Sequence, residues 1–573
     1  MVDIDVLASV GRVDLVTAAQ LGLVLFLLAV VLRPIVHFIR RPYASNLTVL
    51  PHEPVKHFFW GSWPNDAEVG GHFEKYLLKT IKQHGPVNSV TLMGRRPMIV
   101  VGDHRAANKF LLQTPYNRVP LINNIIRRHA GAGLLTTEGA QHRRQRKVAH
   151  PAFTMPAVYD MTPIFHEKAA DLITRLRRKV AADDASTSKE YGSRVDIAKD
   201  LFSAALDIIG AAGFDYQFNS LLGSGETSAL EKAFYDCLHL LTTGTLYSAM
   251  RALLNDPAEK AGRLLGIKEQ AHLDNAKKLV DGISTELVKR AKASGTSGKD
   301  LLTLMVRANT SEELKDHQRL SDEELASLVP VFLFAGHETT ATALSWSMLA
   351  LVDRESGKRI QERLRKELTS DPSFAWRDSP STLDSLPYLD SFTREVMRFY
   401  CPVRSLPRQV PYDDVLPLAH PIKLNDGTTV SEIKVKKHQT VTIPISWINR
   451  DESLWGPDGN VFKAERWLPA GHEFKGPESE LDIDPSVKEL RGVWSNLATF
   501  GAGPQQCIGV RMAIMEFKTL IAHLVTNFEF LPPSLPNEPP VEIDAVMEIV
   551  AHPTIKGDKS KELAMPVRLK ALA

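Results

Sequence analysis

Cysteine is scarce in this chain of 573 residues, which contains three, at Cys237, Cys401 and Cys507. They are too few and too far apart for a disulfide scaffold or for a zinc site built on a Cys-x-x-Cys pair. We therefore expect a reducing compartment. Cys237 and Cys401 are interpreted as small buried hydrophobic residues, which is the usual role of a free cysteine.

Excess charge and linker sequences are missing too. The formal net charge is +2 at pH 7, with basic and acidic residues interspersed, so no nucleic-acid partner is predicted. No Gly/Ser-rich or Pro-rich linker divides the chain, and no G-x-G-x-x-G dinucleotide motif is present. A composition of 44% hydrophobic and 24% charged residues is typical of a globular protein with an extensive core. We expect one large unit.

One long uncharged run is present near the N-terminus, "LVTAAQLGLVLFLLAVVL" at residues 15–32. Its length is close to what a bilayer requires, although a buried core helix can look similar. Aspartates precede the run and arginines follow it, which places the following chain on the cytosolic side. The predicted organisation is a lumenal segment (1–14), a transmembrane signal anchor (15–32), a juxtamembrane linker (33–60) and a main domain (61–573), in a single-pass protein of the endoplasmic reticulum.

The remaining chain is mostly helical in pattern. Residues 164–182 and 273–293 carry apolar residues at spacings of three and four, which is typical of amphipathic helices. Residues 88–101 alternate apolar and polar residues as a short hairpin would, and strand-like segments recur at 422–448. The predicted fold class is mainly α with small β-sheets (α+β).

A second long apolar run covers residues 325–352, and Ser321 with Glu324 forms a capping box just before it. A helix that is apolar all round is expected at the centre of a fold. Polar residues nevertheless interrupt it at 336–340, "GHETT". Burial of such groups is costly unless a function requires it.

Cys507 lies in "FGAGPQQCIG", residues 500–509, directly before another apolar helical segment. Backbone N–H groups and the positive end of a helix dipole are expected to lower the pKa of this thiol. No histidine in the neighbouring sequence pairs with it as a nucleophile would require. The surrounding glycines indicate that something large and flat passes close to the backbone, and haem fits that description.

This segment resembles the haem-binding loop F-x-x-G-x-R-x-C-x-G of the cytochrome P-450 family of haem-thiolate monooxygenases. Phe500, Gly503, Cys507 and Gly509 match it. The resemblance implies the cytochrome P-450 fold in a catalytic domain over 61–573. It also implies a haem b cofactor, with Cys507 as the axial ligand of the iron. A thiolate ligand favours cleavage of the O–O bond.

The polar interruption, "AGHETT" at 335–340, is similar to the family's central-helix motif A-G-x-[DE]-T. The resemblance implies that Glu338 and Thr339 are catalytic and relay protons to bound dioxygen. A different interpretation of the motif alone is a threonine bonded back to its own helix beside a surface glutamate.

Glu395 and Arg398 match the family's E-x-x-R, which pairs with a later arginine, here Arg466. Glu362 and Arg365 repeat the same spacing, and only position in the chain selects the first pair. A buried glutamate between two arginines stabilises the fold behind the cysteine loop and does no chemistry, so this triad is predicted to be structural.

The same resemblance assigns residues to the haem propionates. Arg408 and Arg146 stand where the family places propionate-binding arginines. Gln505 stands where the family has arginine and His142 where it has tryptophan, and Ala464 replaces the proline before the "ERW" segment. Gln505 and His142 still supply hydrogen-bond donors. We expect the haem to bind with altered propionate contacts.

The function implied is a membrane-anchored monooxygenase that inserts one oxygen atom from O2 into a lipophilic small molecule. A terpenoid of secondary metabolism is one such substrate. Electrons from NADPH would arrive through a separate flavoprotein reductase on the same membrane. Lys434, Lys436 and Lys437 are candidates for its docking face, and a solvated strand edge is an equally good interpretation of them. Substrate contacts are expected from 115–133, 214–254, the region of Phe332 and 403–406. Two alternatives are an isomerase or dehydratase of the same fold and a non-catalytic haem-binding membrane protein.

Overall fold

The structure is a computed structural model, and it describes the larger part of the chain. The predicted anchor at 15–32 and Cys237 lie outside the described residues. No helix among the residues described is both long and apolar enough to cross a membrane. The described residues are 36, 46–57, 61–62, 73–92, 96–113, 117–183, 191–222, 247, 256–295, 298–474, 487–488, 490–492, 494–547, 550–558, 560 and 562–572.

The chain divides into two compact units, residues 1–100 with 421–430 and residues 101–420 with 431–573. The first contains helix α2 (Phe73–His84) and the neighbouring strands β1 (Val87–Leu92) and β2 (Arg96–Val101). The paired strands confirm the predicted hairpin. Helix α2 buries Tyr76, Leu77 and Ile81 on one side, as its amphipathic pattern requires.

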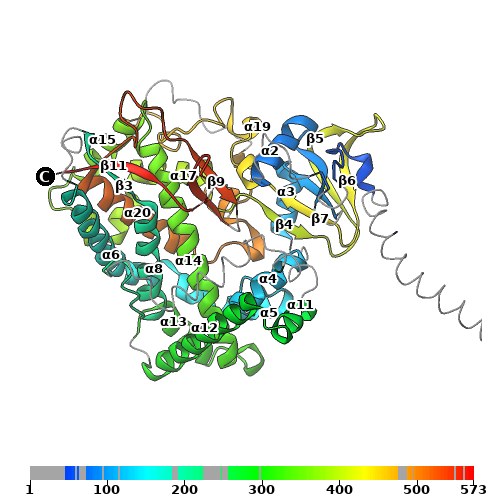
Figure 1. The fold of residues 1–573 in the computed structure, drawn as a ribbon, viewed down its shortest axis with the longest axis horizontal. Helices are drawn as coiled ribbons and strands as arrows, with labels where there is room; N and C mark the ends of the chain where they lie inside the picture. Colours follow the sequence, from blue (N-terminus) through cyan, green and yellow to red (C-terminus); the bar gives the residue numbers. More distant parts are fainter. Residues whose placement is uncertain are drawn as a thin grey trace, which may run out of the picture. The chain divides into compact units, whose positions relative to one another are not determined.

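The second unit is mainly helical (Figure 1), which confirms the predicted fold class at this level. The regions 164–182 and 273–293 fall largely within two long helices, α6 and α12. The helices are α3 (His104–Leu112), α4 (Pro120–Ala130), α5 (Gly139–Ala149), α6 (Met155–Ala181), α8 (Ala198–Phe214), α11 (Asp256–Leu264), α12 (Lys268–Ala293), α13 (Leu301–Thr310), α14 (Asp322–Leu351), α15 (Gly357–Leu368), α16 (Pro380–Ser385), α17 (Pro387–Phe399), α18 (Ile445–Ile448), α19 (Glu452–Trp455) and α20 (Val510–Asn527).

Small antiparallel sheets accompany these helices. Strand β4 (Leu406–Gln409) pairs with β7 (Thr440–Ile443), with Leu406 opposite Ile443. Strand β11 (Pro566–Ala571) lies between β3 (Ser193–Asp196) and β8 (Phe528–Leu531). Strand β10 (Ala551–Ile555) pairs with β9 (Ile543–Met547). Strands β5 (Asp414–Lys423) and β6 (Thr429–Val435) form a further pair, so strands occur in the region predicted at 422–448.

Helix α14 is the centre of this unit, as its apolar sequence predicts. The capping box is present, because Glu324 N donates to Ser321 Oγ and Ser321 N donates to Glu324 Oε2. The helix packs along α8, while α20 packs along α6 (Figure 1). A Cβ at Gly336 would lie 2.8 Å from Ile209 Cδ1. A side chain at position 336 would therefore require Ile209 to change its side-chain conformation, and the glycine leaves room for Ile209 on α8.

Candidate functional site

A cavity inside the second unit is bounded by α14, by β4 and by the loop that precedes α20. Centres of water-sized molecules can occupy about 290 Å³ of it. Its wall is predominantly apolar, which favours a hydrophobic ligand. The apolar residues that line it are Leu134, Leu135, Phe153, Ile209, Leu301, Val331, Phe332, Ala335, Ala343, Met397, Pro402, Val403, Leu406, Ile508, Met512 and Ala513.

The cysteine loop forms one wall of this cavity. Cys507 N donates to Phe500 O at 2.8 Å, which closes the loop, and Phe500, Cys507 and Gly509 all line the cavity. Gly503 does not line it. This glycine has a φ of +67°, and a Cβ there would lie 2.6 Å from the backbone oxygen of Leu111. Gly503 therefore allows the loop to pack against α3, a contact that no side chain would permit.

The Cys507 side chain is exposed within the cavity that its loop lines, and the surrounding protein still desolvates the thiol. Burial raises the pKa of this thiol above its usual value, while the Gly509 N–H and the charge of Arg146 lower it by less. The predicted lowering of the Cys507 pKa is therefore wrong for the protein by itself, because desolvation outweighs the loop dipoles.

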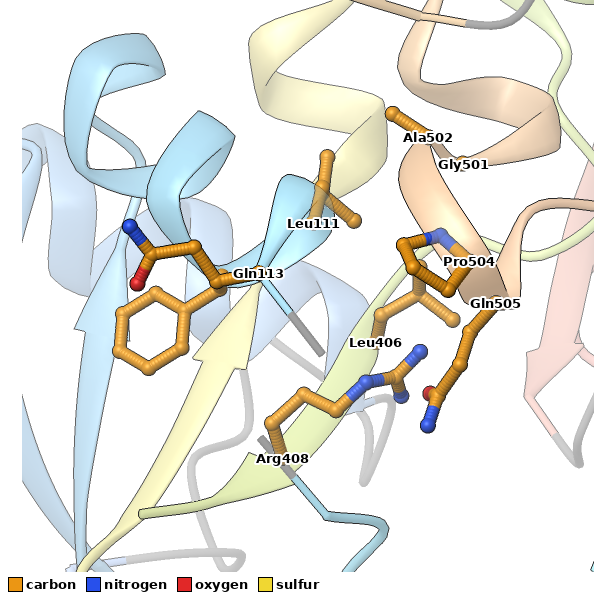
Figure 2. A pocket seen from close by; sticks show the side chains of 9 residues that line it. Leu111, Gln113, Leu406, Arg408, Gly501, Ala502, Pro504 and Gln505 are labelled. Carbon is orange, nitrogen blue, oxygen red and sulfur yellow. The ribbon is translucent and has the colours of Figure 1, made fainter. Parts of the chain in front are cut away.

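Basic and polar side chains gather at one edge of the cavity. Arg146 Nη1 donates to Gln506 O at 2.7 Å, which ties α5 to the cysteine loop. Figure 2 shows Arg408 from β4 and Gln505 from the loop reaching toward the same space, beside Leu406. His142 is buried on α5 and also lines the cavity. The structure thus brings together all four residues predicted to contact the propionates.

Arg118 joins this edge, and sequence reasoning missed it. It lies in the segment 115–133 assigned to the pocket, but no motif marks it. Its Nε has no hydrogen-bond partner within the described residues. Burial lowers the pKa of Arg118 to about 10 and that of Arg408 to about 9. A buried guanidinium without a full set of partners is costly, so this edge requires an anion.

His142 is neutral at this edge. Burial, and then the charges of Arg118 and Arg146, lower the pKa of His142 to about 4. A neutral imidazole can donate one ring N–H to an anion without adding charge. The edge therefore offers three arginines, an imidazole and an amide to carboxylates, while Cys507 offers a sulfur to a metal. These residues fit a haem, whose propionates and iron need those two kinds of partner.

Glu338 and Thr339 point to different surroundings. Thr339 lines the cavity, and its Oγ1 donates to Ala335 O at 2.7 Å. Glu338 does not line the cavity. Its Oε2 lies 3.1 Å from His552 Nε2, and its Oε1 lies 3.7 Å from His337 Nδ1. The predicted proton-relay roles of Glu338 and Thr339 stay a prediction.

The three residues of the predicted structural triad do come together. Arg398 donates from Nε and Nη2 to both oxygens of Glu395, at 2.8 and 2.7 Å. Arg466 Nε donates to Glu395 Oε1 at 3.2 Å. All three residues are buried, and none lines the cavity. Burial by itself would raise the pKa of Glu395, but the two arginines lower it on balance, so the carboxylate stays ionised.

Comparisons with known proteins agree with this geometry. The family model described as "Cytochrome P450" matches residues 51–555. The chain is 33% identical over 547 residues to cytochrome P450 monooxygenase 128 of Postia placenta, which covers 92% of this chain and 93% of that protein. It is 35% identical over 483 residues to cytochrome P450 monooxygenase 205 of the same fungus, covering 82% and 83%. Cytochrome P450 monooxygenase claQ of Ampulloclitocybe clavipes is 30% identical over 505 residues, covering 85% and 86%.

Proposed function

Because this chain belongs to the cytochrome P450 family and is an oxidoreductase of the monooxygenase class, we propose that it inserts one oxygen atom from O2 into a lipophilic small molecule. The observation that supports this most directly is the Cys507 sulfur facing a mostly apolar cavity that has a cationic edge. Haem held by a cysteine thiolate supplies the cleavage of the O–O bond when it is bound.

Different residues of the cavity would bind the iron and the propionates of haem b. Cys507 would ligate the iron. Arg118, Arg146 and Arg408 would neutralise the propionates, because guanidinium groups bind carboxylates through paired, charge-assisted hydrogen bonds. Gln505 and His142 would add neutral donors at the same edge.

The remaining wall would bind the substrate. Val331, Phe332 and Ile209 present apolar surface, and Val403 and Leu406 lie in the region expected to contact the substrate. Transfer of an apolar molecule into such a cavity releases water and keeps water away from the reacting carbon. A terpenoid-like substrate of secondary metabolism is the working proposal, and the apolar wall supports the lipophilic part of it.

The electrons would come from NADPH through a separate flavoprotein reductase. The uncharged run at 15–32 supports a membrane anchor of the endoplasmic reticulum that holds both proteins on one surface. Lys434, Lys436 and Lys437 belong to the proposed docking face, and Lys436 and Lys437 are exposed.

The test uses the full chain, purified with haem. We expect a red-shifted absorption band of the ferrous carbon monoxide complex, and we expect Cys507→Ala to abolish it. Cys401→Ala is the matched control, because Cys401 is buried and does not line the cavity. A red-shifted band that survives in Cys507→Ala would refute the ligand assignment.

The substrate class is tested on the same protein. A screen of terpenoids, sterols and fatty acids for substrate-induced spectral shifts should find ligands, and the best of them should be oxidised when NADPH and a microsomal reductase are added. Oxygen consumption without any oxidised product across all three classes would contradict the proposed activity.

A further inference from the structure

Glu338 is bound by a residue from a distant part of the chain. Its Oε2 lies 3.1 Å from Nε2 of His552, which belongs to strand β10. His552 Nδ1 lies 3.4 Å from Thr342 Oγ1, one helical turn after Glu338 on α14. The ring of Phe202 on α8 packs against His552, with centroids 5.5 Å apart. His552 is thus packed between two helices, with its Nε2 at ion-pair distance from the carboxylate.

The two histidines beside Glu338 differ in their access to water. His337 is fully buried, and burial lowers its pKa below the usual value, so it stays neutral near pH 7. His552 keeps 17% of its side chain exposed and does not line the cavity. A buried carboxylate needs a cation or a proton. His552 can supply either, because an imidazole carries a positive charge when protonated and can donate that proton near physiological pH.

We propose that His552 positions Glu338 and delivers protons to it; this rests on the proposed monooxygenase function, in which each O2 consumes two electrons and two protons. One proton moves from His552 Nε2 to Glu338 Oε2, which leaves a neutral imidazole and a neutral carboxylic acid. No electron moves in this step. The charge attraction that keeps Glu338 on this side of α14 is then gone, and the neutral acid can turn toward the cavity side at Thr339. Water returns a proton to His552.

The groups that face His552 set its pH dependence. From α14 these are the Glu338 carboxylate, neutral His337 and the Thr342 hydroxyl. From α8 it is the apolar ring of Phe202, and the register partner on β9 is the apolar Val546. Among the described residues, Glu338 is the acidic group at ion-pair distance from His552, so the pairing predicts that its charge favours the protonated imidazole.

The first test needs no turnover. Haem-loaded protein carrying ¹³C-labelled histidine rings is titrated by NMR, and His552→Gln identifies the His552 signal. We expect Glu338→Gln to lower the pKa of His552 by about one unit or more, since an opposite charge at this distance typically shifts a pKa by that amount. An unchanged pKa of His552 in Glu338→Gln would overturn the pairing.

The second test separates proton delivery from a structural role. NADPH oxidation with a microsomal reductase and O2 is measured against pH for the wild type, His552→Gln and His552→Phe. The wild-type rate should fall as pH rises through the His552 pKa, because the proton donor is lost. Both variants should lose that limb and run at least about tenfold slower, which is a smaller effect than that of a typical general acid because His552 acts through Glu338. His472→Gln, a half-buried histidine on the 469–474 turn, is the control and should match the wild type.

Cumene hydroperoxide then replaces O2 and NADPH, with tetramethyl-p-phenylenediamine as the electron donor. This oxidant already carries a protonated oxygen, so the His552 variants should keep the wild-type rate. Equal losses in both assays would show a structural role and overturn the proposal. If the wild type fails in both assays and lacks the red-shifted carbon monoxide band, the proposed function fails. If the wild type is active and the His552 variants still show the fall in rate as pH rises, the proposed function stands and the proposed role of His552 is wrong.

Discussion

Arg408 and Arg118 line the same edge of the cavity, and the positive charge of Arg118 acts on that of Arg408 there. Burial lowers the pKa of Arg408 to about 9, and the charge of Arg118 contributes to the lowering. Such an arrangement is unfavourable for the protein alone. It becomes favourable when carboxylates bind between the guanidinium groups. The same two charges therefore destabilise the protein without haem and stabilise the bound propionates.

The first prediction is that Arg118→Gln weakens haem retention and makes the apoprotein no less stable. Loss of a charge-assisted hydrogen bond costs about 1.5 to 3 kcal/mol, or roughly a 10- to 100-fold faster transfer of haem to apomyoglobin. Removal of the repulsion between Arg118 and Arg408 should offset any loss of stability without haem. Arg118→Lys, which keeps the charge, is the control. Haem transfer at the wild-type rate in Arg118→Gln would contradict the assignment.

The second prediction concerns Gln505, which lines a small pocket beside Arg408 (Figure 2). Gln505→Arg should slow haem transfer, because an arginine forms a charge-assisted, bidentate contact that an amide cannot. The same change should lower the free energy of unfolding of the apoprotein by adding a further buried positive charge near Arg408. The two effects are measured by haem transfer and by urea unfolding. Faster haem loss would count against propionate binding at this edge.

A third prediction tests the triad. Glu395→Gln removes the negative charge that both Arg398 and Arg466 contact. Arg398 then loses its anionic partner, and Arg466 keeps only Asp458. We expect a loss of about 3 to 5 kcal/mol in the free energy of unfolding, measured by urea denaturation. Glu362→Gln is the matched control, since Glu362 has the same E-x-x-R spacing but is exposed. Its effect should stay below about 0.5 kcal/mol. Similar losses in both variants would refute the assignment.

The fourth prediction is a pH dependence that originates at His142. Its pKa is about 4 in the folded apoprotein and about 6.5 when unfolded. Below pH 6.5 the unfolded state binds a proton that the folded state does not, so stability should fall from about pH 6.5 to pH 4 by up to about 3 kcal/mol. His142→Gln should make this part of the stability curve less steep, measured by urea denaturation at several pH values. The remaining slope is expected from His166 and His523, whose pKa values burial also lowers. His317→Gln, at an exposed position, should leave the curve unchanged.

Local patterns predicted those parts of the fold that depend on neighbours in the sequence. The capping box at Ser321 and the hairpin of β1 and β2 were both predictable, because their hydrogen bonds join residues a few positions apart. The long apolar run likewise indicated a central helix, since a helix without a polar face must be buried. The order of the motifs was enough to select Glu395 and Arg398 over Glu362 and Arg365.

Contacts between distant segments could not be read in this way. The period of a helix says which residues share a face, but not which face turns to the cavity, so Glu338 and its neighbour Thr339 were predicted together although the structure separates them. The contacts of Gly336 and Gly503 were not predictable from the sequence either. A side chain at 336 would meet Ile209 of α8 and one at 503 would meet the backbone of α3, and only packing creates these contacts.

The sequence by itself determined the family, the cysteine at its centre and the apolar helix beside it, because these depend on residue types at short fixed spacings. The run at 15–32 stays a predicted anchor. Only the tertiary structure placed Arg118 against Arg408 and His552 against Glu338. Those pairs come from segments far apart in the chain, and their charges interact because folding removes the water that would otherwise screen them.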